Sequence, residues 1–209
     1  MAASLATASI ATSSAAADPV TIVALGDSLT QGYGLPVDQG FVPQLQRWLN
    51  DQGADATVLN AGVSGDTTAG GLARTDWALT PETDALIVAL GGNDLLRGFP
   101  PAESRSNLEA ILQKATARNL PVLLVGLIAP GNYGPDYKAN FDAIYPELSA
   151  KYGTLYAENF LGPIAVQPDR ENAMNTLMQP DRLHPNAEGV ALIVEGLGPK
   201  ALELIENIE

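Results

Sequence analysis

Short apolar runs alternate along this chain with longer segments in which apolar residues recur every three or four positions. Five runs rich in Val, Ile, Leu and Ala predict strands, over residues 21–26, 56–62, 85–92, 121–130 and 154–160. Their apolar residues are continuous rather than alternating, which is typical of strands buried on both faces of a parallel sheet. We therefore expect these strands to lie at the centre of the protein.

The longer amphipathic segments between these runs predict helices. They cover residues 41–53, 101–119 and about 137–151, and a last helix follows Pro185. We expect the Gly-Leu-Gly-Pro stretch at 196–199 to interrupt that last helix, because proline lacks the N–H that an interior turn needs. Alternating strands and helices over this length predict an α/β fold, a single-domain three-layer α/β/α sandwich of flavodoxin-like type. Its central sheet is expected to be mostly parallel, with about five strands.

The first 18 residues differ in composition from the rest of the chain. They are rich in Ala, Ser and Thr, and small residues at 15–17 resemble the cleavage site of a secretory signal. We interpret residues 1–18 as a disordered tail or a truncated signal peptide, and residues 19–209 as one domain. This interpretation predicts a periplasmic or secreted protein. The cytoplasm is the alternative, because no basic residue precedes Arg47.

Composition excludes several classes of function. Lys and Arg total 11 against 24 Asp and Glu, a formal net charge of −13, and such a surface repels the phosphates of nucleic acid. The chain has no cysteine and a single histidine, His184, which excludes thiolate nucleophiles, Cys-ligated metals and multi-histidine metal sites. No run reaches the roughly 18 apolar residues that cross a bilayer. We therefore expect no nucleic acid partner, no membrane span, no metal and no other cofactor.

Polar residues follow the predicted strands at their carboxyl ends, where ligands bind in open parallel sheets. Ser28 follows the first strand in Gly-Asp-Ser-Leu, Gly62 ends the second, and Asn93 follows the third in Gly-Gly-Asn-Asp. Each has an ordinary structural interpretation, since a serine there caps a helix and Gly and Asn form turns. Each also fits serine hydrolysis, with Ser28 as the nucleophile and with Asn93 and the Gly62 N–H as oxyanion donors. Asp27 and Asp94, which flank Ser28 and Asn93, are expected to bond their loops in place.

The single histidine lies in a segment suited to a catalytic base. Asp181 precedes His184 by three residues, and Pro180 and Pro185 restrain this segment as a loop before the last helix. At that spacing the carboxylate can bond Nδ1 and leave Nε2 for a hydroxyl. An isolated histidine is more often structural, and that alternative stays open here. The paired Asp181 and the two prolines favour the catalytic interpretation.

Four sequence blocks together resemble those of a known family. The motifs GDSL, the Gly of NAGVSGDT, GGND and DRLHP resemble the blocks of the SGNH, or GDSL, hydrolase superfamily. The longer stretches GGNDLLRGF, SGDTTAGGLAR and NYGPDYKANFDAIYPEL resemble its bacterial branch of acyl thioesterases, lysophospholipases and arylesterases, and the resemblance runs from about Val20 to the final helix. It implies a catalytic triad and an oxyanion hole. The triad would be Ser28, Asp181 and His184, and the hole would be formed by the amides of Ser28 and Gly62 and the side chain of Asn93.

These motifs predict a serine esterase that hydrolyses carboxylic esters and thioesters through an acyl-enzyme. The expected partners are small-molecule acyl esters or thioesters: aryl esters, short to medium acyl chains, and acyl-CoA or lysophospholipid as further candidates. An acetyl-sugar esterase of the same superfamily and a non-catalytic binding relative are alternatives. A nucleotide-binding module is disfavoured, because residues 26–34 contain neither G-x-G-x-x-G nor a G-K-S/T end.

Two loop segments, residues 64–79 and 128–141, are expected to line the substrate cleft. With the strand end before the second segment, they offer an apolar wall of Leu72, Trp77, Leu127, Ile128 and Tyr133. The acidic surface would oppose the approach of acyl-CoA phosphates unless Arg74 or Arg97 faces the mouth of the cleft.

Overall fold

Five parallel strands form the centre of the structure, a computed structural model that describes residues 19–208. The strands are β1 (Val20–Gly26), β2 (Ala56–Gly62), β3 (Ala85–Ala89), β4 (Val122–Val125) and β5 (Leu155–Ala157). Their order is β2-β1-β3-β4-β5, and every neighbouring pair is parallel. This arrangement confirms the predicted class of fold and number of strands. The predicted tail or signal peptide over residues 1–18 lies outside the described residues.

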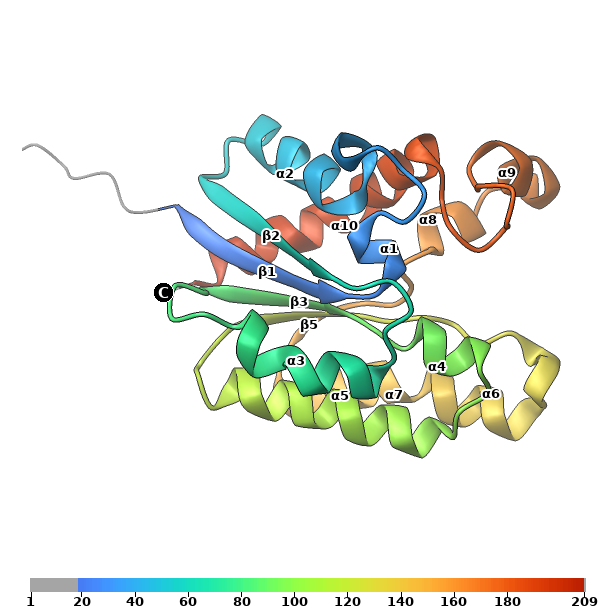
Figure 1. The fold of residues 1–209 in the computed structure, drawn as a ribbon, viewed down its shortest axis with the longest axis horizontal. Helices are drawn as coiled ribbons and strands as arrows, with labels where there is room; N and C mark the ends of the chain where they lie inside the picture. The colour runs from blue at the N-terminus through green and yellow to red at the C-terminus, as the bar shows by residue number, and fades with distance from the viewer. Residues whose placement is uncertain (1–18, 209) are drawn as a thin grey trace, which may run out of the picture.

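Helices cover both faces of the sheet (Figure 1). On one face, α2 (Phe41–Asp51) packs against α10 (Ala187–Glu206). On the other face, α5 (Pro101–Thr116) packs against both α3 (Thr68–Ala78) and α7 (Ile144–Tyr152). The predicted three-layer α/β/α sandwich is therefore confirmed.

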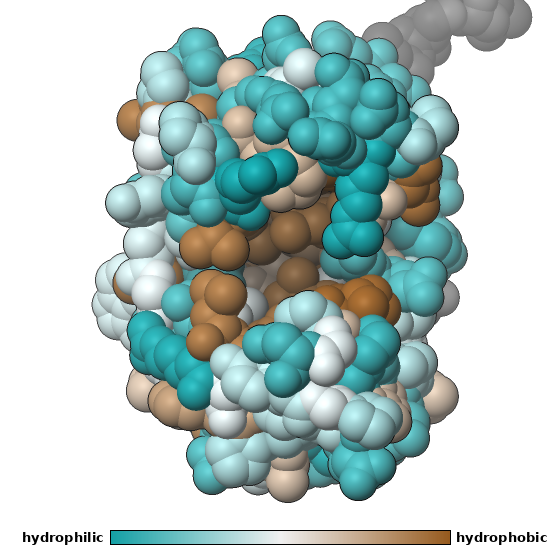
Figure 2. All heavy atoms as spheres, turned by 90° about the vertical axis from the view of Figure 1, so that its right-hand side faces the viewer, coloured by the Kyte–Doolittle hydropathy of each residue, from teal (hydrophilic) through white to brown (hydrophobic). Residues whose placement is uncertain are grey.

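Shorter helices gather at the carboxyl ends of the strands, on the right in Figure 1. They are α1 (Ser28–Gln31), α4 (Gly92–Leu96), α6 (Pro135–Asp142), α8 (Gly162–Ala165) and α9 (Arg170–Thr176), with single 3₁₀ turns at Val37–Gln39 and Gly131–Tyr133. This end of the molecule faces the viewer in Figure 2, where a hollow lined by hydrophobic atoms opens at its centre. Such an opening lies where a parallel sheet is expected to bind its ligand.

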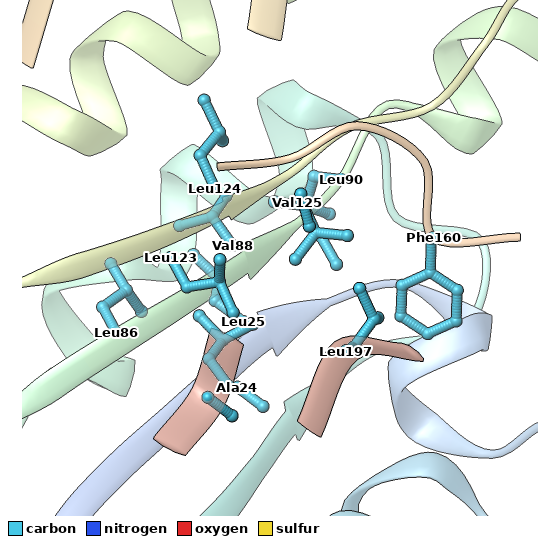
Figure 3. Packing of buried hydrophobic residues seen from close by; sticks show 14 of the residues in the cluster. Ala24, Leu25, Leu86, Val88, Leu90, Leu123, Leu124, Val125, Phe160 and Leu197 are labelled. Carbon is cyan, nitrogen blue, oxygen red and sulfur yellow. The ribbon is translucent and has the colours of Figure 1, made fainter. Parts of the chain in front are cut away.

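The core is built from the apolar runs that predicted the strands. Residues of β1, β3 and β4 pack with α10 in one buried cluster, shown in Figure 3. Leu25, Leu86 and Leu124 are fully buried within it. Burying a Leu side chain contributes about 1.5–3 kcal/mol, and this packing holds the strand ends that carry the polar residues in fixed positions.

Three predicted strands end earlier than their apolar runs, and one of them is β5, which ends at Ala157 rather than at residue 160. β3 ends at Ala89 rather than at residue 92, and β4 covers Val122–Val125 rather than 121–130. Leu90, Leu127 and Ala129 are buried all the same, because they lie in loops that cover the core. An apolar run indicates which residues are buried, but it does not indicate where the hydrogen bonding between neighbouring strands ends.

The helix predicted over about 137–151 is two helices, α6 and α7, which meet at Ala143. Pro146 lies in the first turn of α7, where the N–H that it lacks would otherwise have bonded to the carbonyl of Asp142. The proline is tolerated at the start of a helix and not within one, so it favours a new beginning here.

The interruption predicted at 196–199 is wrong, because α10 runs unbroken from Ala187 to Glu206 with Pro199 inside it. Pro199 and Glu195, whose carbonyl loses its partner, both lie on the exposed side of the helix, where water can bond that carbonyl. Gly198 on the opposite side is buried, and a Cβ there would lie 2.7 Å from the Trp48 ring. Packing of the buried side therefore keeps the helix continuous.

Candidate active site

Ser28 is the first residue of α1, immediately beyond β1. The helix is capped by Asp27, whose Oδ1 accepts the Leu29 N–H at 3.0 Å, so Ser28 is not the capping residue. Gly26 is required just before this turn, because a Cβ there would lie 1.9 Å from Thr30 Oγ1. The Ser28 N–H has no hydrogen-bond acceptor within residues 19–208. The backbone N–H and the side-chain hydroxyl of Ser28 are therefore both presented at the end of the strand.

The loop between α9 and α10 places His184 beside Ser28. His184 Nε2 lies 2.8 Å from Ser28 Oγ. The Gln179 N–H donates to the His184 carbonyl at 2.8 Å, and Gln179 Nε2 donates to the carbonyl of Tyr33, also at 2.8 Å. The Tyr33 ring packs against the imidazole, with 4.7 Å between ring centroids. The loop is thus held to the segment that follows α1, which fixes the imidazole relative to the hydroxyl.

Asp181 bonds to the other ring nitrogen of His184. Its Oδ2 lies 2.6 Å from Nδ1, and its Oδ1 accepts the N–H groups of Leu183 at 3.0 Å and His184 at 3.1 Å. Partial burial raises the pKa of Asp181, but the hydrogen bonds from the imidazole and the two backbone N–H groups outweigh burial and lower it to about 2. An ionised carboxylate only accepts, so Nδ1 carries the ring proton and Nε2 is left to accept from the Ser28 hydroxyl.

The structure brings one of the two further predicted oxyanion donors to Ser28. Asn93 lines the same cleft as Ser28, and its Nδ2 donates to the Asp66 carbonyl at 2.9 Å, which leaves a second amide N–H. The Gly62 N–H instead donates to Asn60 Oδ1 at 2.9 Å, so it already has an acceptor. A Cβ on Gly62 would lie 2.4 Å from the Gln31 backbone nitrogen, so its role here is to let β2 approach α1 closely.

A second glycine in the turn after β2 was missed by the sequence analysis. Gly65 adopts a φ of +85°, and its N–H has no acceptor among the described residues. The carbonyl of the next residue, Asp66, accepts the Asn93 amide, so this turn lies directly beside Asn93. The motif NAGVSGDT offers two glycines, and only the second leaves its N–H unbonded on the Asn93 side.

Two buried carboxylates hold the loops of the site, as predicted. Asp27 is 2% exposed, and burial raises its pKa to about 6, although the Leu29 N–H and the nearby His184 partly oppose this rise. Asp94 accepts from the Thr68 N–H at 2.8 Å, the Thr68 hydroxyl at 2.6 Å and the Ser104 hydroxyl at 3.1 Å. The chain therefore presents a well-bonded carboxylate at α4 and a sparsely bonded one beside the candidate nucleophile.

The cleft that contains Ser28 and His184 has a volume of about 400 Å³ and mostly apolar walls. Its apolar residues include Leu95, Leu96, Leu127, Ile128, Leu161 and Met174. Two of the five predicted wall residues, Leu127 and Ile128, are therefore in place. The other three do not line it: Trp77 is 82% exposed, Leu72 packs on the core, and the Tyr133 hydroxyl bonds to the Leu96 carbonyl. Helices α8 and α9, which the sequence did not predict, supply another part of the wall.

The arginines predicted for the mouth have structural contacts instead. Arg74 pairs with Asp66 at 2.6 Å and donates to the carbonyls of Ala61 and Gly26, which braces the ends of β2 and β1. Arg97 donates to the Gly65 carbonyl at 3.0 Å. Neither residue lines the cleft, whereas Arg170 and Arg182 do.

The described part of the chain, residues 19–208, lacks membrane-spanning helices and metal-binding clusters. No helix in this part of the chain has the length and apolar character to span a membrane. Nor does it contain a group of three or more His, Asp or Glu side chains that could hold a metal ion.

Comparison with known proteins identifies the family. The model of the GDSL-like lipase/acylhydrolase family matches residues 24–192. The chain is 39% identical to esterase TesA of Pseudomonas aeruginosa, over 88% of this chain and 89% of that protein. It is 36% identical to thioesterase 1/protease 1/lysophospholipase L1 of Escherichia coli K12, over 92% of this chain and 88% of that protein. The crystal structure of AlinE4, an SGNH-hydrolase family esterase, matches with a TM-score of 0.73 at 42% identity, covering 90% of this chain and 98% of that chain. The chain therefore belongs to the GDSL-like lipase/acylhydrolase family, as its sequence blocks predicted.

Proposed function

We propose that this chain is a serine esterase that hydrolyses carboxylic esters and thioesters, with Ser28, His184 and Asp181 as its catalytic triad. The observation that carries the proposal is the chain of contacts from Ser28 Oγ to His184 Nε2, at 2.8 Å, and from His184 Nδ1 to Asp181 Oδ2, at 2.6 Å. The relatives named esterase TesA and thioesterase 1/protease 1/lysophospholipase L1 support this class of reaction.

The reaction proceeds through an acyl-enzyme. Ser28 Oγ attacks the carbonyl carbon of the ester while His184 Nε2 takes the hydroxyl proton, and Asp181 stabilises the imidazolium that forms. The tetrahedral intermediate then expels the alcohol or thiol, which receives the proton from His184. Water repeats the same steps on the acyl-enzyme, so that the acid leaves and the Ser28 hydroxyl is restored.

Three N–H groups would stabilise the negative oxygen of the intermediate. They are the backbone N–H of Ser28, the second amide N–H of Asn93 and, in place of Gly62, the backbone N–H of Gly65. The first and last have no acceptor within residues 19–208, and Asn93 has one donor left. Donors that are already fixed at the place where charge develops need no reorganisation during the reaction.

The apolar cleft favours an acyl chain over a sugar as the group that it buries. A volume of about 400 Å³ suits short to medium acyl chains and aryl esters. An acetyl-sugar esterase needs several side-chain donors and acceptors for the sugar hydroxyls, and the apolar wall offers few. A non-catalytic binding relative remains the alternative that labelling and kinetics must reject.

Kinetics of p-nitrophenyl acetate, butyrate and octanoate hydrolysis test the proposal. Ser28→Ala and His184→Ala should each lower kcat by more than about ten-thousandfold, because removing either residue disables the same step. The double variant should fall little further than either single variant. The matched control is Ser64→Ala, since the Ser64 hydroxyl bonds to Gln31 Oε1 at 2.8 Å outside the cleft. If the fold-loss in kcat of the double variant equals the product of the two single losses, or if Ser64→Ala loses as much activity, Ser28 and His184 do not act in one shared chemical step.

We further propose that the enzyme acts in the periplasm or outside the cell. The Ala-, Ser- and Thr-rich composition of residues 1–18, with small residues at 15–17, supports export. Expression of the full chain in a bacterial host followed by cell fractionation tests this idea. Activity confined to the cytoplasmic fraction would contradict it.

A further inference from the structure

Two arginines at the cleft differ from every other basic side chain in the molecule. Of the 11 Lys and Arg side chains, all but Arg170 and Arg182 bond to a carboxylate or a carbonyl within residues 19–208. Both exceptions line the cleft that contains Ser28 and His184. The two side chains that have no partner in this structure therefore lie beside the candidate catalytic residues.

Acidic side chains are abundant in this chain, and they leave these two arginines unpaired. The formal net charge is −13, so a partner for an exposed guanidinium is easily found. Of the two carboxylates next to Arg170, Asp169 caps α9 by accepting the Asn172 N–H at 3.0 Å, and Glu171 makes no ion pair with it. The carboxylate next to Arg182, Asp181, bonds to His184. Figure 2 shows strongly hydrophilic atoms at the edge of the apolar hollow. Arg170 and Arg182 thus place two positive charges at an opening whose walls are mostly apolar.

The backbone at Arg182 is strained in a way that favours glycine. Its φ is +59°, and Asn119 is the only other non-glycine residue with a positive φ in the described part of the chain. Asn tolerates this conformation, but a long side chain such as Arg rarely adopts it. Strain of this kind gathers at functional sites, where the surrounding structure maintains it. The strained backbone and the place of Arg182 in the lining of the cleft together make this residue a candidate for a functional role.

Arg182 lies on the side of the cleft where the leaving group must be. It precedes His184 by two residues in the loop fixed by the Gln179 contacts, and its own N–H donates to the Gln179 carbonyl at 2.9 Å. His184 delivers the proton to the departing alcohol or thiol, so that group must face the His184 loop. The loop that holds the general acid therefore also holds a cation near the leaving group.

We propose that Arg170 and Arg182 form a subsite for a phosphate carried by the leaving alcohol or thiol of the substrate. This inference rests on the proposed function, because only hydrolysis gives the cleft a leaving group. Arg binds phosphate with a planar fork of N–H donors. A phosphate monoester carries up to two negative charges, so it balances the charge of two guanidinium groups, whereas a carboxylate carries only one negative charge. Two kinds of substrate share this chemistry, namely lysophospholipids and acyl thioesters of phosphopantetheine.

The test compares substrates that differ only by a phosphate. One pair is 1-decanoylglycerol and its 3-phosphate, and the other is S-decanoyl-pantetheine and its 4′-phosphate. The full-length protein should show a higher kcat/KM for the phosphorylated member of at least one pair, and that pair identifies the source. Replacing both arginines, as Arg170→Gln with Arg182→Gln, should lower kcat/KM for that member roughly tenfold or more, as expected when two charged hydrogen bonds are lost. Hydrolysis of the neutral member should stay within about twofold, and the preference should weaken at high salt.

Two further variants separate recognition from folding and from net charge. Arg182→Gly relieves the backbone strain, so it should fold normally and still lose part of the phosphate preference. Arg47→Gln with Arg105→Gln removes the same charge away from the cleft, where Arg47 bonds to the Asp38 carbonyl and Arg105 to Glu147, and should keep the preference.

Each remaining outcome decides the question. If the wild type hydrolyses neutral esters without preferring either phosphorylated partner, the subsite is wrong and the proposed function stands. Equal losses on neutral and phosphorylated substrates in the arginine variants would also overturn the subsite, since they indicate a structural role. If no member of either pair is hydrolysed, both the subsite and the proposed function fail.

Discussion

The substitution Asp27→Asn measures how much the buried negative charge of Asp27, beside Ser28, lowers the free energy of unfolding. Asp27 is 2% exposed, and the one hydrogen bond that its carboxylate accepts within residues 19–208 comes from the Leu29 N–H at 3.0 Å. Asn has the same shape and is an equally good N-cap, so the variant keeps that hydrogen bond and loses the charge, while its buried amide N–H₂ adds a cost that does not depend on pH. The change with pH in the stability difference between the two proteins is therefore the test of desolvation.

The size of the effect follows from the pKa of Asp27, which burial raises from 3.8 to about 6. Because the folded state holds this proton more tightly than the unfolded state, the carboxyl contributes stability that is fully present below pH 3.8 and is lost as pH rises to about 6. A shift of about two pH units corresponds to about 3 kcal/mol, all of it lost at pH 8. At pH 5 about half of that loss has occurred.

Urea unfolding of the wild type and Asp27→Asn at pH 5 and pH 8 measures this difference, and both values avoid precipitation near the pI of about 4.3. The stability of the variant relative to the wild type should rise by roughly 1–2 kcal/mol between the two pH values. Asp169→Asn is the matched control, because it changes an exposed N-cap of the same type, on α9. A stability difference between the two proteins that is equal at both pH values, or that shifts in favour of the wild type as pH rises, would refute the reasoning.

Two further substitutions probe the neighbouring polar residues. Asp94→Asn should destabilise the protein by about 1–3 kcal/mol in urea unfolding at pH 8, the reverse of Asp27→Asn. Thr68 and Ser104 donate hydrogen bonds to the Asp94 carboxylate, and the amide N–H₂ of Asn would place a donor against these donors. A stabilised Asp94→Asn would contradict that account. Asn93→Ala should lower kcat about a hundred- to thousandfold on p-nitrophenyl butyrate with little change in KM, the effect typical of one lost oxyanion donor. A rise in KM alone would indicate that Asn93 contributes to binding instead.

The sequence predicts the architecture of this chain because burial dominates its pattern. The runs that became β1, β3 and β4 are nearly continuous in Val, Ile, Leu and Ala, and the sheet that they form is covered on both faces. Helix ends depend on finer balances. Pro199 is tolerated because it lies on the exposed side of α10, while Pro146 starts α7 because it lies in a first turn. The pattern of apolar residues does not indicate which of these two prolines a helix will tolerate in its interior.

The candidate site was only partly predictable for a related reason. Ser28, Asn93, Asp181 and His184 follow strand ends or precede a helix, and a parallel sheet brings such positions to one edge. The choice between Gly62 and Gly65 depends on which N–H is already bonded, and that requires coordinates. The cleft walls likewise depend on the short helices α8 and α9, which have no strong apolar period to reveal them.

Covalent labelling with a fluorophosphonate, followed by peptide mass spectrometry, tests most directly whether the imidazole activates the hydroxyl at the end of β1. The wild type should form one adduct on the peptide that contains Ser28, with complete loss of esterase activity, and His184→Ala should react at a small fraction of the wild-type rate. An adduct on another serine, or wild-type labelling of Ser28 in the absence of His184, would contradict the account.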